Sequence, residues 1–268
     1  SDLCSTGGPG IDWWRLLTGC QGSFGVVTMM NVKIFHKPLL QKVRFIAFNS
    51  LEEAVRPFYA IQKREIGHEC FLLNSYAMAT IMAQGQEEIP GLAKKIPPYV
   101  LVLNLWGGQF FPEDRIAYEA MAVDEIAEQY NLAAGERLDG VSEANLRMQK
   151  MLTRPWEGDV YWKERLAGGC LELVIESGLD KVPSHWKLFK GMAAEHAIDT
   201  RHLGLYIQPR QRARVCHVEF HIPCDPDSAA EAAPVKAFQR AAFEGLINAG
   251  AFFYRPYYDW AQTIYTRS

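Results

Sequence analysis

The stretch Thr18-Gly-Cys-Gln-Gly-Ser-Phe-Gly-Val-Val-Thr28 contains three glycines with two residues between each and the next, and it runs straight into a β-rich segment over residues 24–35. The spacing G-x-x-G-x-x-G differs from the G-x-G-x-x-G of a dinucleotide-binding unit, and no helix opens on it. Glycines in such a turn let backbone N–H groups approach a ligand closely. The same spacing also suits an ordinary turn before a strand, and both interpretations stay open.

The rest of the chain mixes strand-like and helix-like patterns without the strict alternation of a parallel sheet. Branched and aromatic residues predict strands over residues 43–48, 99–106, 170–175, 203–207, 215–222 and 252–254. Helical periodicity and capping residues predict helices over residues 51–61, 74–83, 113–130, 183–196, 225–248 and 257–266. Residues 133–160 are polar and irregular, which predicts an exposed excursion. The predicted fold class is α+β, with helices covering one side of an antiparallel sheet.

Composition excludes several classes of protein. The 268 residues carry 28 Lys and Arg against 31 Asp and Glu, and 49% of them are hydrophobic. This apolar content excludes a disordered chain, and the length suits one large domain or two ordinary ones. A nucleic-acid binder needs a basic face, which a net charge of −3 does not favour. No apolar run has the length of a transmembrane helix. We therefore expect neither nucleic acid nor a membrane as a partner.

The cysteines indicate a reducing compartment. None of the six forms a C-x-x-C pair: Cys4, Cys20, Cys70, Cys170, Cys216 and Cys224. In a chain of this length they favour reduced, mostly buried thiols over a disulfide framework. No basic segment followed by an apolar one opens the sequence, so no signal peptide is visible. The expected localisation is cytoplasmic.

Three polar side chains alternate along one predicted strand. His217, Glu219 and His221 are two residues apart, so they share one face of the sheet. Such a row can line a polar cavity, and it can also lie on an exposed sheet face. A third interpretation is a metal-dependent enzyme in which these residues bind a divalent ion. The sequence favours the polar cavity, and the expected metal content is none.

A second polar group follows the long helix and Gly250. Tyr254 and Arg255 are neighbours within Phe253-Tyr-Arg-Pro-Tyr-Tyr-Asp-Trp260. A tyrosine hydroxyl and a guanidinium together supply hydrogen-bond donors suited to an oxyanion. Arg255 can equally serve as a surface ion-pair partner.

The glycine stretch and the Tyr-Arg pair, in this order, resemble the FAD-linked oxidase superfamily of the vanillyl-alcohol oxidase and p-cresol methylhydroxylase type. The segments Tyr161-Trp-Lys-Glu-Arg-Leu-Ala-Gly-Gly-Cys170 and Leu205-Tyr-Ile-Gln-Pro209 also resemble FAD-linked oxidases. The resemblance implies FAD as cofactor and hydride transfer from a small phenolic or hydroxy-acid substrate to flavin N5. The superfamily also contains an ether-lipid synthase, which uses its flavin without net oxidation.

The resemblance also implies roles for individual residues. Those beside FAD would be Gly22, Ser23, Gly25 and Val27, with Cys170 near the position where relatives tether the flavin; we expect noncovalent FAD. The residues implied to be catalytic are Tyr254, Arg255 and His217, which stands 37 residues before Tyr254. The second-rank substrate-binding candidates are Tyr206 and Glu219.

The resemblance divides the chain into two parts. Residues 1–40 would be the C-terminal remnant of an FAD-binding domain and residues 41–268 the substrate-binding cap domain, truncated at its C-terminal segment. The expected partners are then a small-molecule substrate and an N-terminal FAD-domain half, on the same or a separate polypeptide, with a homo-oligomer possible. A non-catalytic binding or assembly module with the cap fold is the alternative, in which the surplus of aromatic residues forms an interface.

Overall fold

The computed structural model describes residues 17–20, 22–34, 36–155, 157–158, 160–255 and 259–267. The chain forms two compact units, one ending at His36 and the other beginning at Lys37, and each is described by itself. In the first unit the backbone N–H of Ser23 donates to the carbonyl of Cys20 and closes a turn. The predicted strand at residues 24–35 is wrong for the described residues 24–34, which form no strand. A strand needs a hydrogen-bonding neighbour, and none is provided within this described unit.

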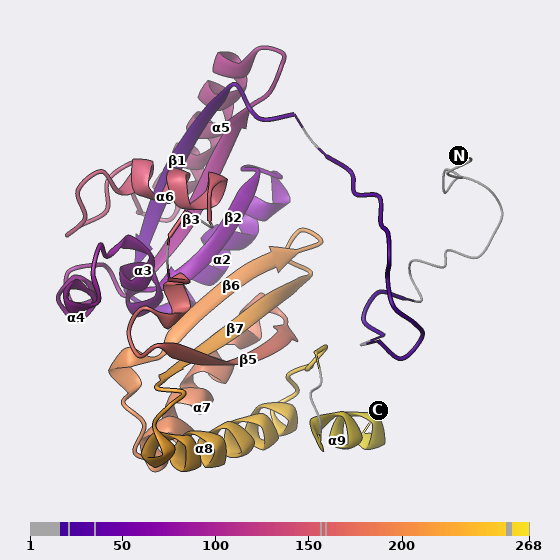
Figure 1. Cartoon of the computed structure of the whole chain (residues 1–268). Helices are drawn as coiled ribbons and strands as arrows, with labels where there is room; N and C mark the ends of the chain where they lie inside the picture. Colours follow the sequence, from indigo (N-terminus) through magenta and orange to yellow (C-terminus); the bar gives the residue numbers. More distant parts are fainter. Residues whose placement is uncertain are drawn as a thin grey trace. The chain divides into compact units, whose positions relative to one another are not determined.

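The second unit is built on one antiparallel sheet, drawn in Figure 1. Its strands are β1 (Leu40–Phe48), β2 (Glu69–Asn74), β3 (Tyr99–Gly107), β4 (Ala134–Gly135), β5 (Gly169–Ser177), β6 (Gly204–Arg210) and β7 (Val215–Cys224). Their order across the sheet is β4-β1-β3-β2-β6-β7-β5, and every neighbouring pair is antiparallel. The α+β fold class predicted from the sequence is confirmed.

Helices lie in the connections between these strands, except between β6 and β7, which a short turn joins. The α-helices are α2 (Leu51–Lys63), α3 (Ser75–Met82), α4 (Ile89–Ala93), α5 (Pro112–Gln129), α6 (Ala144–Thr153), α7 (Val182–Glu195), α8 (Ala229–Asn248) and α9 (Asp259–Arg267). Single 3₁₀ turns are η1 (Gln86–Glu88), η2 (Trp162–Glu164), η3 (Leu179–Lys181) and η4 (Thr200–His202). Two side-chain hydrogen bonds cap the start of α2. The Ser50 hydroxyl accepts a hydrogen bond from the Glu53 N–H, and the Glu53 carboxylate accepts one from the Asn49 N–H.

The sheet consists of two halves with mirrored strand order. Apart from α3 and α4, which connect β2 to β3, the first half runs β1-α2-β2-β3-α5-β4 and places its strands in the order β4-β1-β3-β2. The second runs β5-α7-β6-β7-α8 and ends in an isolated bridge between Glu176 and Phe252, beside β5. Each half is a βαββαβ arrangement of the ferredoxin-like type. The halves meet where β2 pairs with β6, through Leu72–Ile207 and Leu73–Tyr206.

One face of the sheet is covered along its whole width. The crossover helices α2, α5, α7 and α8 pack there against alternate strand residues. Phe189 of α7 stacks on Phe220 of β7 with ring centroids 4.6 Å apart and also contacts Phe238 of α8 at 5.1 Å. All three rings are fully buried, and this apolar layer fixes which face of β7 points away from the core.

The opposite face is covered over only part of its width. There α3, α4 and α6 pack on β1, β2 and β3 through a second apolar cluster. The irregular segment predicted for residues 133–160 is wrong at α6, which buries Ala144 and Met148 four residues apart. Figure 1 looks onto this face and shows β6 and β7 beyond the cover of these helices. The site described below lies on this less covered half.

Candidate functional site

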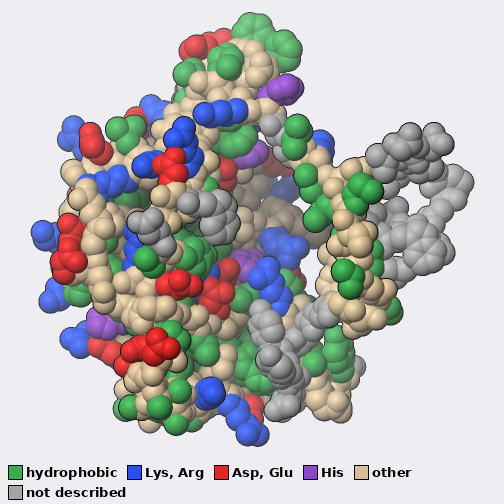
Figure 2. All heavy atoms as spheres, in the orientation of Figure 1, with side chains coloured by type: hydrophobic (Ala, Val, Ile, Leu, Met, Phe, Trp, Pro, Cys, Tyr) green, Lys and Arg blue, Asp and Glu red, His purple; other side chains and the backbone are tan. Residues whose placement is uncertain are grey.

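The side chains predicted to share a strand face do so on β7. Cys216, Val218, Phe220 and Ile222 belong to the core layer, so the residues between them point to the other face. Antiparallel pairing places Tyr206 of β6 beside Glu219, and Glu172 of β5 beside His221. Figure 2 shows charged and histidine side chains gathered in the hollow at the middle of the view.

A chain of hydrogen bonds joins the C-terminal segment to this strand face. The Tyr254 hydroxyl lies 2.7 Å from Nδ1 of His217, and Nε2 of His217 lies 2.7 Å from Oε1 of Glu219. The other Glu219 oxygen, Oε2, lies 2.9 Å from Nε2 of His221. Three of the residues singled out in the sequence, Tyr254, His217 and Glu219, are therefore in direct contact although 37 residues separate the first from the second.

A buried lysine binds the same carboxylate. Nζ of Lys163, in the 3₁₀ turn η2, lies 2.5 Å from Oε2 of Glu219 and also pairs with Glu172. Lys163 is only 8% exposed, and its ammonium also lies 5.3 Å from the ring centroid of Trp162. Burial alone would lower the pKa of Lys163, but the two carboxylates raise it, so the ammonium stays charged.

The same contacts set the protonation of Glu219. Burial alone would raise the pKa of Glu219, but hydrogen bonds from His217 and His221 and the Lys163 charge lower it well below its usual range. Burial lowers the pKa of His221, which is 2% exposed. The site thus holds an ionised glutamate between a neutral imidazole at His221 and an ammonium.

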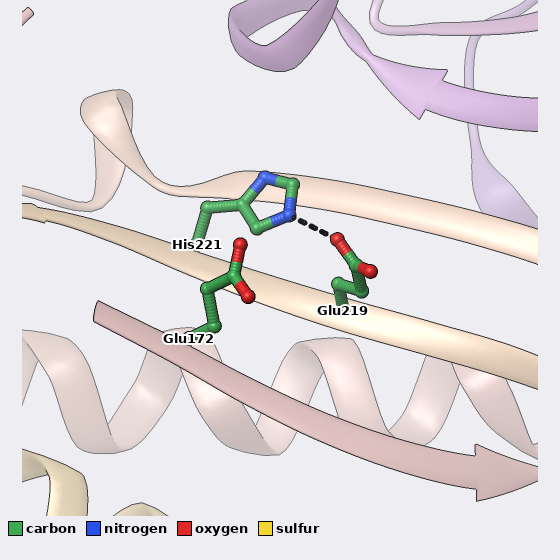
Figure 3. Close-up of side chains that lie close together, drawn as sticks. All are labelled: Glu172, Glu219 and His221. Carbon is green, nitrogen blue, oxygen red and sulfur yellow. Dashed lines mark hydrogen bonds and ion pairs between the residues drawn. The ribbon is translucent and has the colours of Figure 1, made fainter. Parts of the chain in front are cut away.

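The metal interpretation is weakened by this lysine. Figure 3 shows Glu219 and His221 on β7 and Glu172 on β5 pointing toward one another, and one ligand atom of each lies within 4.8 Å of the others. However, the Lys163 ammonium contacts both carboxylates and supplies the positive charge that an ion would bring. A metal would have to displace a buried, doubly paired cation, which is unfavourable.

Beside His217 the surface is hollowed into a recess of about 360 Å³. Its lining is Gln208, Pro209, Arg210, His217, Tyr254 and Arg255. The guanidinium carbons of Arg210 and Arg255 lie 5.9 and 5.1 Å from the centroid of the Tyr254 ring. Arg255 is exposed, whereas Arg210 also pairs with Glu176 of β5. The recess is therefore lined by a tyrosine whose ring has a guanidinium group on either residue beside it, Arg210 and Arg255, and this positive charge attracts an anion.

The two tyrosines of the site are protonated at neutral pH. Burial raises the pKa of Tyr254, and the nearby guanidinium groups lower it only in part. Burial also raises the pKa of Tyr206, and the Glu219 charge raises it further. The Tyr206 ring lies edge-on to His217 at 6.0 Å and against Phe71 at 5.6 Å. Tyr206 thus borders the site next to the apolar cluster beneath α3.

The other predicted residues are not part of the hydrogen-bonded series. Cys170 is the second residue of β5, half-buried on the same face as Glu172, and burial raises the pKa of its thiol to about 12. Gly22, Ser23, Gly25 and Val27 belong to the first unit, where Gly22 and Gly25 have φ of +82° and +148° and are exposed.

Among the described helices, none combines the length and apolar character needed to cross a membrane.

Sequence reasoning missed the residues that surround the row on β7. Lys163, Glu172 and Arg210 come from η2, β5 and β6, so only the fold brings them to His217 and Glu219. One signal was present: Glu172 lies in the strand predicted over residues 170–175 and Glu176 follows it directly, so a strand one residue longer places both on one face. Two acidic residues on one face indicate a polar surface with cationic partners.

Comparison with known proteins extends the description of the fold. No protein-family profile and no curated protein matches the sequence of this chain. Among solved structures, one of alkyldihydroxyacetonephosphate synthase superposes with a TM-score of 0.63 at 13% identity, covering 93% of this chain and 46% of that one. A second structure of this synthase gives 0.58 at 11% identity, covering 96% and 47%. The chain thus spans about half the length of the solved structures it matches, and over that span it has the fold of the corresponding part of alkyldihydroxyacetonephosphate synthase.

Proposed function

We propose that this chain is the substrate-binding part of an FAD-dependent oxidoreductase. The observation that carries the proposal is the hydrogen-bonded series Tyr254–His217–Glu219, which opens into a recess between Arg210 and Arg255. A tyrosine that is hydrogen-bonded to a buried imidazole, which is bonded in turn to a carboxylate, is suited to proton transfer. The shared fold with alkyldihydroxyacetonephosphate synthase supports the flavoenzyme assignment.

The substrate would be a small phenol or hydroxy acid. Both classes carry an oxygen that is negative during reaction, and the two guanidinium groups beside Tyr254 favour such an oxygen. Arg255 would hold the oxygen and Tyr254 would contact it, while Tyr206 and Glu219 would shape and polarise the floor of the site. The size of the recess, about 360 Å³, suits a ligand of one ring or a short acid.

The first unit would lie along one edge of an FAD molecule. The turn at Gly22 is exposed, and a Cβ placed on Gly22 or Gly25 would meet no atom within 4 Å, so a ligand can reach the backbone. Gly22, Ser23, Gly25 and Val27 would then lie along the cofactor, held by backbone contacts. When bound, FAD supplies the electron acceptor, N5 of its ring, for the hydride that the substrate loses.

The remainder of the FAD site would come from a partner segment, on the same or a separate polypeptide. Residues 24–34 are extended and leave large apolar side chains in solvent: Phe24, Val26, Val27, Met29, Met30, Val32 and Ile34. Val26 is 90% exposed and Ile34 85%. An apolar extended segment of this kind is suited to adding a strand to a partner sheet. A purely binding or assembly role, without catalysis, shares this feature.

An absorbance spectrum tests the proposal. The chain is mixed with FAD, alone and together with the segment that supplies the FAD domain, and free cofactor is then removed. We expect the complex to keep the two visible absorbance bands of a bound flavin and to be bleached by a phenolic or 2-hydroxy-acid substrate. A complex that stays colourless would contradict the enzyme proposal and leave the assembly role. A flavin that is retained but never bleached would favour the ether-lipid synthase type of reaction, without net oxidation.

A further inference from the structure

Both carboxylate oxygens of Glu219 act as hydrogen-bond acceptors. Its Oε2 accepts hydrogen bonds from Nζ of Lys163 and from Nε2 of His221. The ionised carboxylate has no proton to give, so Oε1 also accepts. The group 2.7 Å from Oε1 is Nε2 of His217, which must therefore carry a proton.

The tautomer of His217 follows from this contact. We take His217 as neutral in the resting site, so that it carries one proton, and the contact with Glu219 puts this proton on Nε2. Its Nδ1 is then an acceptor, and the atom 2.7 Å away is the Tyr254 hydroxyl. Tyr254 consequently donates its proton inward to His217, and the lone pairs of its oxygen are left for a donor from the recess.

From this directed series we propose that Tyr254, His217 and Glu219 form a relay that takes the proton of a substrate hydroxyl bound in the recess. The substrate O–H proton passes to the Tyr254 oxygen as the Tyr254 proton passes to Nδ1 of His217. The products are a substrate oxyanion and a His217 imidazolium held by Glu219, so charge and protons balance. The relay rests on the proposed function and names its substrate as a hydroxyl compound that binds in its protonated form.

The relay changes the role expected for Tyr254. The sequence led us to expect Tyr254 to donate to an oxyanion already present. In the resting site its proton faces His217, and only after transfer does the imidazolium donate to Tyr254, whose hydroxyl then donates to the new oxyanion. Arg255 provides the second donor at that stage.

Several charged and titratable side chains surround His217. The charged and titratable side chains around His217 and its two partners are Tyr161 and Lys163 at η2, Glu172 and Glu176 on β5, Tyr206 and Arg210 on β6, His221 on β7, and Arg255. Lys163 lies behind Glu219, away from His217, and Arg210 is paired with Glu176. The carboxylate in direct contact with His217 is thus the charge that stabilises the imidazolium.

Nitrogen NMR of the ¹⁵N-histidine-labelled chain tests the resting state without cofactor or substrate. At neutral pH we expect His217 to be protonated at Nε2 with Nδ1 unprotonated. His196 is an internal control of opposite kind, because its Nδ1 lies 2.9 Å from the Met192 carbonyl and must carry the proton there. Tyr254→Phe should shift the His217 Nδ1 signal toward that of a free acceptor and leave His196 unchanged. A His217 protonated at Nδ1, alone or together with Nε2, overturns the relay.

A coloured phenol tests the transfer itself. p-Nitrophenol is yellow only as its phenolate, so binding should raise the phenolate absorbance at a pH where the free probe is mostly protonated, with no proton released to a pH indicator. Tyr254→Phe should abolish the colour change, whereas Tyr118→Phe, on exposed α5 surface, should keep it. Glu219→Gln provides a second test, with the same expected loss of colour. Colour that survives in Tyr254→Phe overturns the relay. A probe that does not bind contradicts the proposed phenolic substrate, and the NMR tautomer then decides the relay by itself.

Discussion

Nζ of Lys163 lies 2.5 Å from Oε2 of Glu219, and this contact ties the short turn η2 to the central strand of the second half-sheet. Glu172 on the edge strand β5 is held by the same ammonium. One cation therefore neutralises two carboxylates that the sheet places on adjacent strands. Its removal affects both the fold and the site.

Lys163→Met should destabilise the protein. The substitution leaves the largely buried Glu219 without its counter-charge. Removing one partner of a buried ion pair in this way costs about 2–4 kcal/mol here, because Glu172, the other carboxylate, is partly hydrated. The measurement is the free energy of unfolding in urea. Lys187→Met, at an exposed position of α7, is the matched control and should change it by less than about 0.5 kcal/mol. Equal effects of the two substitutions would show that the Lys163 pairs do not stabilise the fold.

Stability should fall at acid pH through Glu219. Its pKa in the folded state is lowered below the ordinary value of about 4.3, so the folded protein binds fewer protons there than the unfolded chain. The contribution is present above that value and is lost as the pH falls toward the folded pKa. His221 adds to the same trend because burial lowers its pKa. We expect the stability difference between wild type and Glu219→Gln to shrink from neutral to acid pH in urea titrations. A difference that stays constant over this range would contradict the assignment.

Arg255→Ala should impair turnover of the assembled enzyme and leave flavin content unchanged. Loss of a donor to a developing oxyanion costs about 2–4 kcal/mol, which corresponds to a fall in kcat/KM of roughly 30- to 1,000-fold. Arg255→Lys should recover part of the loss because it keeps the charge without the planar fork. Arg240→Ala, on the exposed surface of α8, serves as control. Unchanged turnover in Arg255→Ala would mean that this guanidinium does not contact the substrate.

Cys170 should react slowly with thiol reagents and should not hold the flavin covalently. Burial raises the pKa of its thiol to about 12, and the nucleophilic form is the thiolate, which is scarce at neutral pH. Alkylation by iodoacetamide, followed by mass spectrometry, should label Cys170 far more slowly in the folded chain than in urea. Cys170→Ser should retain as much flavin as the wild type. A flavin adduct on a Cys170 peptide would contradict this prediction.

Most of the sheet could be predicted from local patterns because its strands alternate or run as continuous apolar stretches. The strand predicted at residues 99–106 is β3, and that at 215–222 lies within β7. Helix α6 was missed because its start lacks a side-chain cap and follows Glu143, which has a φ of +52°. The spacing of Ala144 and Met148 was visible in the sequence, but no capping residue marked where the period began.

The sequence predicted which site residues share a strand, but not which strands bring their side chains together. The alternation of residues along a strand predicted that His217, Glu219 and His221 share one face, and Tyr254 was identified because it precedes Arg255. The direct bond between Tyr254 and His217 depends on the bridge between Phe252 and Glu176, which brings the C-terminal segment beside β5. Lys163 is 56 residues from Glu219, and no local pattern connects the two.

The mirrored halves of the sheet bear on how such a chain can arise. Two βαββαβ units meet edge to edge at equivalent strands, β2 and β6, through two residue pairs, as two copies of a small dimeric protein would. Duplication and fusion of a half-length gene leaves this arrangement, and later divergence erases the repeat from the sequence while the topology keeps it. In the first half this face is apolar and is covered by α3, α4 and α6. In the second half the equivalent face carries the ionisable groups of the site, so the two halves combine one topology with two different surface chemistries.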